Sequence, residues 1–283
     1  MLPLHLALVS ESSAIGITDV TRTAAALQKQ VLRDFLPIWS IPATVDPFDR
    51  LEDIPLGYWP MIVEDDIHQA GAEGIHLDED GQPFSLIQVG ESWSLTASHE
   101  CLEMLVDPFG DRIQAGRTIK PGQGRVEYLV EVCDPCEALD FAYTVNGIVV
   151  SDFYTPNYLD PIRRPGTSYS FTGAVTRPRE VLRGGYLSWR HPPSNHWWQA
   201  VFFGNQLRFV DLGVLTGKIT ENLRATIDKL TSFEDLAPEL VGVIAEDDPR
   251  LAAVRVPEDE AAGATESKAE SWRRQIANLR AGA

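Results

Sequence analysis

Apolar and polar positions along the chain follow two periods, one typical of strands and one typical of helices. Residues 4–9 form a short apolar run, which predicts a buried strand. From Thr18 to about Phe35, apolar residues recur at helical spacing behind a Thr-Asp start, which predicts an amphipathic helix. Further strands are predicted at 38–45 and 58–63, and a hairpin at 74–89 around an Asp-Gly turn.

A second helix is predicted from Thr96 to about Val106. Leu95, Leu102 and Leu105 form an apolar stripe along it, so this helix belongs to a core and not to a solvated surface. The following Asp107-Pro108 ends the helix, because the residue before a proline disfavours helical backbone angles.

The remainder of the chain divides into a β-rich part and a different C-terminal part. Strands are predicted at 126–132, 184–189, 197–203 and 207–210, with a hairpin at 141–150 on an Asn-Gly turn. Beyond these, we expect a short helix at 222–230, a poorly ordered linker at 258–270 and a terminal helix at 270–279. The predicted organisation is one folded domain at 1–215 and a helical, acidic and partly disordered tail at 216–283.

Composition and the start of the chain narrow the class of protein. The 283 residues are 44% hydrophobic, enough for a large core, and no apolar run approaches the roughly 20 residues of a membrane span. The apolar N-terminus lacks a basic region and a clear cleavage site, so we interpret it as a strand and not as a signal peptide. We therefore expect a cytoplasmic protein that does not bind membranes, with virion association or signal-independent export as the alternative.

Charge is strongly negative and unevenly distributed. The net charge is −17, and between Asp46 and Asp107 the only Lys or Arg is Arg50. Such a surface disfavours binding to nucleic-acid phosphates and favours attraction of cations or basic peptides. The simpler interpretation, that the acidic surface only keeps the protein soluble, stays open.

Three cysteines do not form a disulfide framework. Cys133 and Cys136 make a C-x-x-C pair, but no second pair exists to complete a zinc ribbon. A redox role is disfavoured because a strand-like run leads into the first cysteine, where a redox motif needs a helix. We expect a buried pair, either free or bridged.

Candidate chemistry lies in the helix predicted over 96–106, which contains H-E-x-x-E. His99 and Glu103 are four residues apart and project from one face, where both can ligate a zinc ion. Glu100 lies about 100° round the helix, the position of the general base in H-E-x-x-H metallopeptidases. The motif predicts hydrolysis by a metal-activated water; the alternative is two ordinary acids and a capping or core histidine.

A third ligand is needed, and the segment 131–136 offers two candidates. H-E-x-x-E, then Asp-Pro, then E-x-x-D-x-C resembles a zincin-like group that includes plant EXORDIUM-like (phosphate-induced) proteins and bacterial hypothetical proteins. The matching residues are His99, Glu100, Glu103, Asp107, Pro108, Glu131, Asp134 and Cys136. The chain departs from the plant members in lacking their secretory signal and a matching Trp in its 112–124 insert.

This resemblance implies an α+β, zincin-like fold for the domain at 1–215. A mixed sheet with a backing helix would lie above the H-E-x-x-E helix. The β-rich second half would follow this helix in the chain. By analogy, Glu131 would be the third ligand and Asp134 would orient His99, although the reverse assignment stays open. The expected ion is Zn²⁺, although two carboxylates with one imidazole would make harder ions such as Mn²⁺ or Ca²⁺ more competitive.

The functional hypothesis is a zinc-dependent metallopeptidase in which Glu100 is the general base. A peptide or protein substrate would lie along the edge strand at 74–77. Tyr186 and His196 are further catalytic candidates for stabilising an oxyanion, the alternative for His196 being packing against tryptophan. The competing hypothesis is a non-catalytic, metal-stabilised binding or structural protein of accessory or virion type. Oligomeric state is not predicted.

Overall fold

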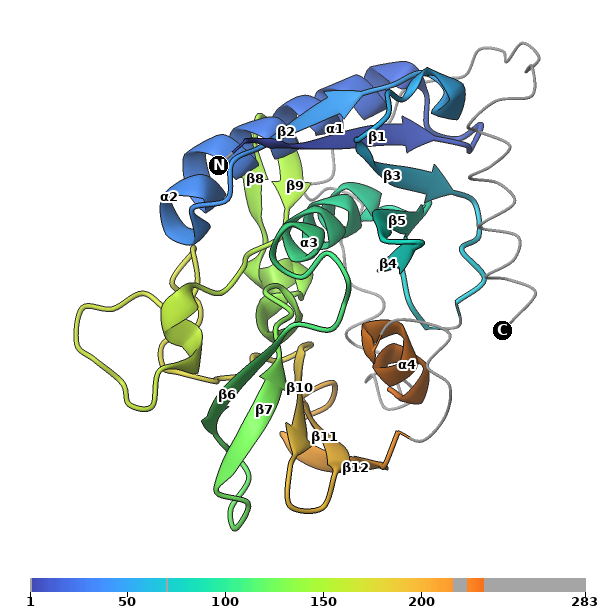
Figure 1. The fold of residues 1–283 in the computed structure, drawn as a ribbon. Coiled ribbons are helices and arrows are strands. Elements are labelled where there is room, and N and C mark those ends of the chain that lie inside the picture. Colours follow the sequence, from blue (N-terminus) through green and yellow to red (C-terminus); the bar gives the residue numbers. More distant parts are fainter. Residues whose placement is uncertain (1, 70, 216–222, 232–283) are drawn as a thin grey trace.

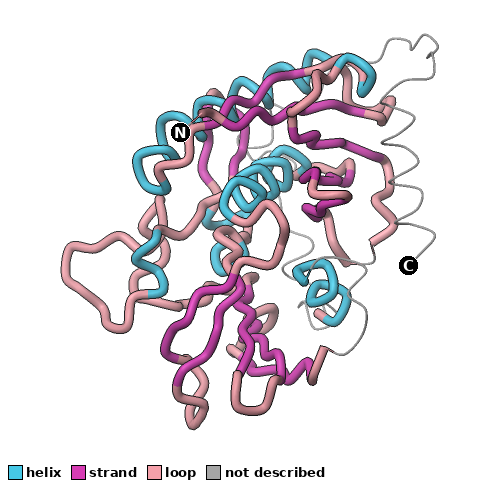
Figure 2. Tube along the Cα trace, in the orientation of Figure 1, coloured by secondary structure: helices cyan, strands magenta, loops and turns pink. Residues whose placement is uncertain are grey.

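The computed structural model describes residues 2–69, 71–215 and 223–231. These residues form a mixed α+β fold with two five-stranded sheets and a two-stranded hairpin (Figure 1). The helices gather around the first sheet, whereas strands and loops dominate the later part of the chain (Figure 2). The described helices include none that is both long enough and apolar enough to cross a membrane.

The first sheet has the strand order β2-β1-β3-β5-β4. Its strands are β1 (Leu4–Ser10), β2 (Ala43–Pro47), β3 (Trp59–Glu64), β4 (Gly74–Glu79) and β5 (Gln82–Gln88). The first four strands in this order pair in parallel, whereas β4 is antiparallel to β5 and forms one edge. The sheet is therefore mixed, and its antiparallel edge strand is the one that leads toward the candidate site.

The helices of the first half cover one face of this sheet. They are α1 (Ile17–Gln30), a π-helical turn (Val31–Phe35), α2 (Leu36–Trp39) and α3 (Trp93–Val106). Leu6, Leu8 and Met61 belong to the same apolar cluster as buried residues of α1 and α3. The intervening Ala7 and Ile62 belong to a second cluster, because alternate side chains of a strand point to opposite faces.

Helix α3 is the central element of the molecule. It packs against β4, β5 and the hairpin of β8 (Tyr143–Val145) and β9 (Ile148–Val150), and all its residues are buried (Figure 1). It ends at Asp107, whose carboxylate accepts the backbone N–H groups of Asp111 and Arg112. A helix buried on all sides carries its polar side chains into the core, where they need partners.

The second sheet is antiparallel and has the order β12-β11-β10-β7-β6. Its strands are β6 (Ile113–Arg117), β7 (Arg125–Leu129), β10 (Tyr186–His191), β11 (His196–Val201) and β12 (Arg208–Gly213). Tyr128 and Trp189 of this sheet join the apolar cluster of α3, so both sheets share one core. Helix α4 (Leu223–Leu230) lies next to β4.

The predictions for individual elements have mixed outcomes. The helices at 18–35, 96–106 and 222–230, both hairpins and the β-rich second half are confirmed. The strand predicted at 38–45 begins only at Ala43, because α2 continues to Trp39, and β6 was not predicted. Cys133 and Cys136 are buried as expected, but both are free thiols, so the bridged alternative is wrong. The linker and terminal helix predicted beyond residue 258 lie outside the described residues.

Candidate metal centre

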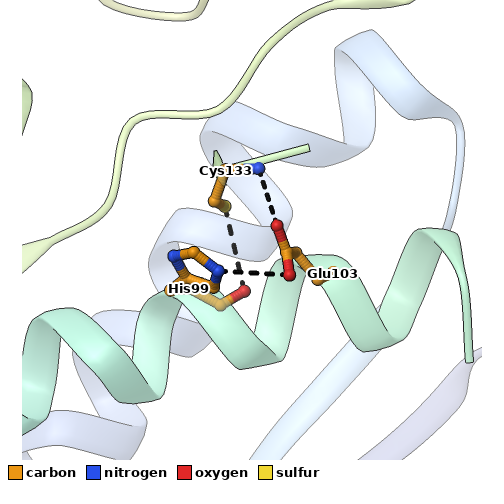
Figure 3. Close-up of side chains that lie close together, drawn as sticks. All are labelled: His99, Glu103 and Cys133. Atoms are coloured by element: carbon orange, nitrogen blue, oxygen red, sulfur yellow. Dashed lines mark hydrogen bonds and ion pairs between the residues drawn. The ribbon is translucent and has the colours of Figure 1, made fainter. Parts of the chain in front are cut away.

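His99 and Glu103 of the H-E-x-x-E motif lie on one buried face of α3. His99 Nε2 is 3.1 Å from Glu103 Oε2, as the four-residue spacing predicts. Figure 3 shows these side chains beside Cys133, whose backbone N–H donates to Glu103 Oε1 at 3.0 Å. The thiol of Cys133 points toward the carbonyl oxygen of His99, with a sulfur–oxygen distance of 3.8 Å. The segment after β7 is thus fixed onto α3 by Glu103.

The same segment brings Asp134 to the histidine. Asp134 Oδ1 lies 3.3 Å from His99 Nε2, and its backbone N–H lies 3.3 Å from Glu103 Oε1. The backbone at Gly185, just before β10, packs closely against this turn. A Cβ at position 185 would lie only 2.5 Å from the carbonyl oxygen of Asp134. His99, Glu103 and Asp134 therefore meet around one imidazole nitrogen.

Glu131, the other candidate for third ligand, is also buried beside the cluster. Both its carboxylate oxygens lack a hydrogen-bond partner among the described residues, as do Glu103 Oε2 and Asp134 Oδ1. Of the two candidates, Asp134 is in direct contact with His99. Asp134 is therefore the candidate that meets His99, whereas Glu131 meets Arg224.

Glu100 lies on the adjacent face of α3, toward the edge strand. Its Oε2 is 3.3 Å from Nδ1 of His76, whose Nε2–H donates to the carbonyl oxygen of Asp107 at 2.9 Å. Strand β4 approaches so closely that a Cβ at Gly74 would lie 2.8 Å from Glu100 Oε1. Glycine at position 74 thus leaves room for the Glu100 carboxylate.

Arg224 of α4 inserts its guanidinium into the same cluster and is itself buried. Its atoms approach five carboxylates: Nη2 lies 2.9 Å from Glu103 and 3.7 Å from Asp134, Nε 3.2 Å from Glu131, and Nη1 3.5 Å from both Glu100 and Asp228. A sixth carboxylate, that of Glu137, lies 3.9 Å from His99 Nδ1. The described cluster therefore has more acidic than basic groups.

This excess of carboxylates perturbs the pKa values. Burial alone would raise the pKa of Glu103, but His99 and Arg224 outweigh it and hold that pKa well below its usual range. Burial and the neighbouring Glu103 raise the pKa of Glu131 well above its usual range and that of Asp134 to about 7. Burial would lower the pKa of His99, yet Glu103 and Asp134 raise it well above its usual range. The cluster lacks enough positive charge to keep every carboxylate ionised.

These residues fit a divalent cation. Nε2 of His99 lies 3.1 Å from Glu103 and 3.3 Å from Asp134, and His99 belongs to two compact groups of potential ligands, one with Glu103 and Cys133 and one with Asp134 and Glu137. Zinc and harder divalent ions accept such donor atoms. Four of the buried carboxylate oxygens make no hydrogen bond among the described residues, although His99 and Arg224 lie within ion-pair distance of three of them. A bound divalent ion would give these oxygens a partner.

The two further catalytic candidates lie in different places. Tyr186, at the start of β10, is buried, and its hydroxyl lies 3.4 Å from Asp228 Oδ1 beside α4. His196, at the start of β11, contacts Asp211 of the neighbouring strand at 2.9 Å and is partly exposed. The structure therefore brings Tyr186 to the edge of the cluster and does not bring His196 there; a catalytic role for either stays a prediction.

Arg224 and Asp228 were not expected at the site, whereas His76 lies on the edge strand predicted to border it at 74–77. Arg224 is separated from Glu100 by 124 positions and carries no local motif, so the sequence offers no signal for it. The position of His76 follows from the confirmed hairpin, because β4 is the strand beside α3.

Comparisons with protein-family models, with curated proteins and with solved structures found no match for this chain. The function of the chain must therefore be inferred from the residues of the site.

Proposed function

We propose that this protein is a metal-dependent hydrolase of zincin-like design that cleaves peptide bonds. The observation that carries the proposal is the meeting of His99, Glu103 and Asp134 around one imidazole nitrogen, with Glu100 next to His99 on the same helix. The motif similarity to EXORDIUM-like proteins is part of the same proposal.

The arrangement of the first half supports this proposal. A mixed sheet carries its helices on one face, and its antiparallel edge strand β4 lies along α3. This is the arrangement expected from the resemblance. An extended peptide would pair with β4 by strand addition, which would bring its carbonyl groups next to α3.

The residues would divide the chemistry as follows. His99, Glu103 and Asp134 would hold the ion, with Glu131 as the alternative to Asp134. A divalent ion bound there supplies a Lewis acid that activates water and polarises a carbonyl group. Glu100 would accept the proton of the attacking water, and His76 would hold the Glu100 carboxylate in place at 3.3 Å.

The donor set also bears on which ion binds. Two carboxylates and one imidazole make a harder and more negative site than two imidazoles and one carboxylate. We propose Zn²⁺ as the ion, with Mn²⁺ or Ca²⁺ as competitors, and we expect slow hydrolysis because the carboxylates reduce the acidity of the metal.

Metal content of the purified chain is the first test, with His99→Ala and the matched control His196→Ala. Plasma mass spectrometry should find about one zinc per chain in the wild type and in His196→Ala, and much less in His99→Ala. Zinc that is retained in His99→Ala, or lost equally in both variants, would contradict the proposed site.

Hydrolysis is tested with Glu100→Gln and a library of fluorogenic peptides. The substitution keeps the size of the side chain and removes the proton acceptor, so turnover should fall by about 10²–10⁴-fold while zinc content stays unchanged. The same assay with His196→Ala tests the catalytic role predicted for His196. Unchanged turnover in Glu100→Gln would exclude the assigned mechanism.

A second function, a non-catalytic protein stabilised by a metal ion, is favoured by the burial of the cluster. Glu103 is 0% and Glu100 is 2% exposed, and Arg224 lies across both. Under this function the wild type binds zinc through His99 but cleaves no peptide, and zinc raises the melting temperature of the wild type and Glu100→Gln equally.

A further inference from the structure

Arg224 contacts the same carboxylate oxygens that would bind the metal ion. Its Nη2 lies 2.9 Å from Glu103 Oε2 and 3.7 Å from Asp134 Oδ1. These two oxygens are the ones that lie 3.1 and 3.3 Å from His99 Nε2. The guanidinium and a metal ion on His99 would therefore share two oxygen atoms.

Such sharing is unfavourable for two cations. A zinc ion on these ligands lies about 2.0–2.2 Å from each donor atom, so the guanidinium would remain within a few ångströms of a divalent charge. The two positive charges repel strongly in a buried site, where water screens them poorly. Arg224 in its observed position would therefore oppose the binding of a metal ion to these oxygens.

Helix α4, which carries Arg224, makes further contacts with the described residues. The backbone N–H of Arg224 donates to the carbonyl oxygen of Gly110 at 2.9 Å, and Thr231 bonds to Gln199 at 2.7 Å. Ala225 and Ile227 contribute its buried apolar side chains. Because α4 has eight residues and an exposed Leu230 at its end, we expect it to shift at smaller cost than α3, all of whose residues are buried.

We infer that α4 is an intramolecular inhibitor of the metal centre, in which Arg224 and a divalent ion compete for the same carboxylates. The inference rests on the proposed function and adds its regulation. Without metal, Arg224 supplies positive charge to the cluster and α4 covers Glu100 and Glu103. Metal binding expels the guanidinium, and the accompanying shift of α4 opens the buried cluster to substrate.

The test is the zinc affinity of the full chain, measured by competition with a chromophoric chelator. Arg224→Gln removes the competing charge and should bind zinc at least tenfold more tightly than the wild type. Arg224→Lys keeps the charge and should stay closer to the wild type. Arg125→Gln, which changes an exposed arginine of β7, should leave the affinity unchanged.

Hydrogen exchange of the wild type provides a second readout that needs no variant. Adding zinc should increase amide exchange in 223–231 and protect the amides of 131–134. Unchanged exchange in 223–231, together with equal zinc affinity of Arg224→Gln and the wild type, would overturn the inference.

His99→Ala in both the wild-type and Arg224→Gln backgrounds separates the two proposals. If zinc binding requires His99 in both backgrounds, and Arg224→Gln binds zinc no more tightly than the wild type, the metal centre stands and the inhibitory role of Arg224 falls. If zinc binding depends on His99 in neither background, the metal centre falls and the inhibitory role falls with it.

Discussion

The two sides of the acidic cluster are built very differently. One side, which we call the α3 wall, consists of His99, Glu100 and Glu103 on a helix whose residues are all buried. The other side, the α4 wall, consists of Arg224 and Asp228 on a helix of eight residues. Both walls carry charges that face each other in the core, yet α3 packs against β4, β5 and β9, whereas α4 packs mainly against β4.

This difference indicates which part of the site is permanent. Polar groups on α3 cannot leave the core without disturbing the shared packing of both sheets, so the α3 wall is a fixed set of ligands. The α4 wall is joined to the cluster by the ion pairs of Arg224, whose attraction is offset in part by the cost of burying the charges. Substitutions in the two walls should therefore differ greatly in their effect on stability.

The largest effect is expected for Glu103→Ala in the α3 wall. The substitution removes the acceptor of the backbone N–H groups of Cys133 and Asp134 and leaves Arg224 without its nearest carboxylate. Removing one partner of a buried ion pair destabilises a protein by about 3–5 kcal/mol. Urea unfolding should show this loss, whereas the exposed Glu91→Ala should change the free energy of unfolding by less than about 0.5 kcal/mol. A loss in Glu103→Ala as small as that of the control would refute the idea of a fixed wall.

A smaller loss is expected for Gly74→Ala, where β4 meets the α3 wall. The added methyl carbon would lie 2.5 Å from Thr96 Cγ2 and 2.8 Å from Glu100 Oε1, so helix or strand must shift. Overpacking of this kind costs about 1–3 kcal/mol. Gly90→Ala is the matched control, because a Cβ there meets nothing within 4 Å. Equal melting temperatures of the two variants would mean that β4 is not held tightly against α3.

The α3 wall was predictable because its signals are local. The apolar stripe and the Asp107-Pro108 stop defined the helix, and the four-residue spacing placed His99 next to Glu103. The Asp-Gly turn fixed the hairpin of β4 and β5, where Asp80 and Gly81 adopt positive φ angles of 53° and 77°. Each of these features depends on residues within one or two elements of each other.

The α4 wall could not be predicted in the same way. An arginine in a short amphipathic helix normally faces water, and no spacing rule links it to a motif 124 residues earlier. Strand β6 was missed for a related reason, because its residues are largely exposed and show no apolar alternation. Contacts made by tertiary packing alone leave no periodic trace in the sequence.

The dependence of stability on pH gives a subtler test of the α3 wall and its neighbours. The pKa of Asp134 is raised to about 7 by burial and by Glu103, so the folded chain holds a proton that the unfolded chain releases near pH 4. The stabilisation that the protonated Asp134 carboxyl contributes is therefore fully present below about pH 4 and is lost as pH rises toward 7. The free energy of unfolding is measured with urea at several pH values in the presence of a metal chelator. Between about pH 4 and 7, the stability of Asp134→Asn relative to the wild type should rise by about 1–3 kcal/mol.

Added zinc provides the control for that measurement. A divalent ion stabilises the ionised carboxylate, so zinc should stabilise the wild type most at the upper end of the window, and Asp134→Asn should gain less. A relative stability of Asp134→Asn that is independent of pH would show that Asp134 titrates normally and that the excess of carboxylates is balanced in another way.

The smallest effect is expected for Asp228→Asn in the α4 wall. Asp228 approaches Arg224 Nη1 at 3.5 Å and the hydroxyl of Tyr186 at 3.4 Å, and both distances are long for strong hydrogen bonds. The free energy of unfolding should therefore change by less than about 1 kcal/mol, close to the value for the exposed control Asp140→Asn. Zinc affinity should rise by about two- to threefold only in Asp228→Asn, because Arg224 loses one of its five carboxylates and is held less firmly. If Asp228→Asn instead destabilises the chain as much as Glu103→Ala, α4 is an integral part of the core, and the contrast between a fixed and a movable wall is wrong.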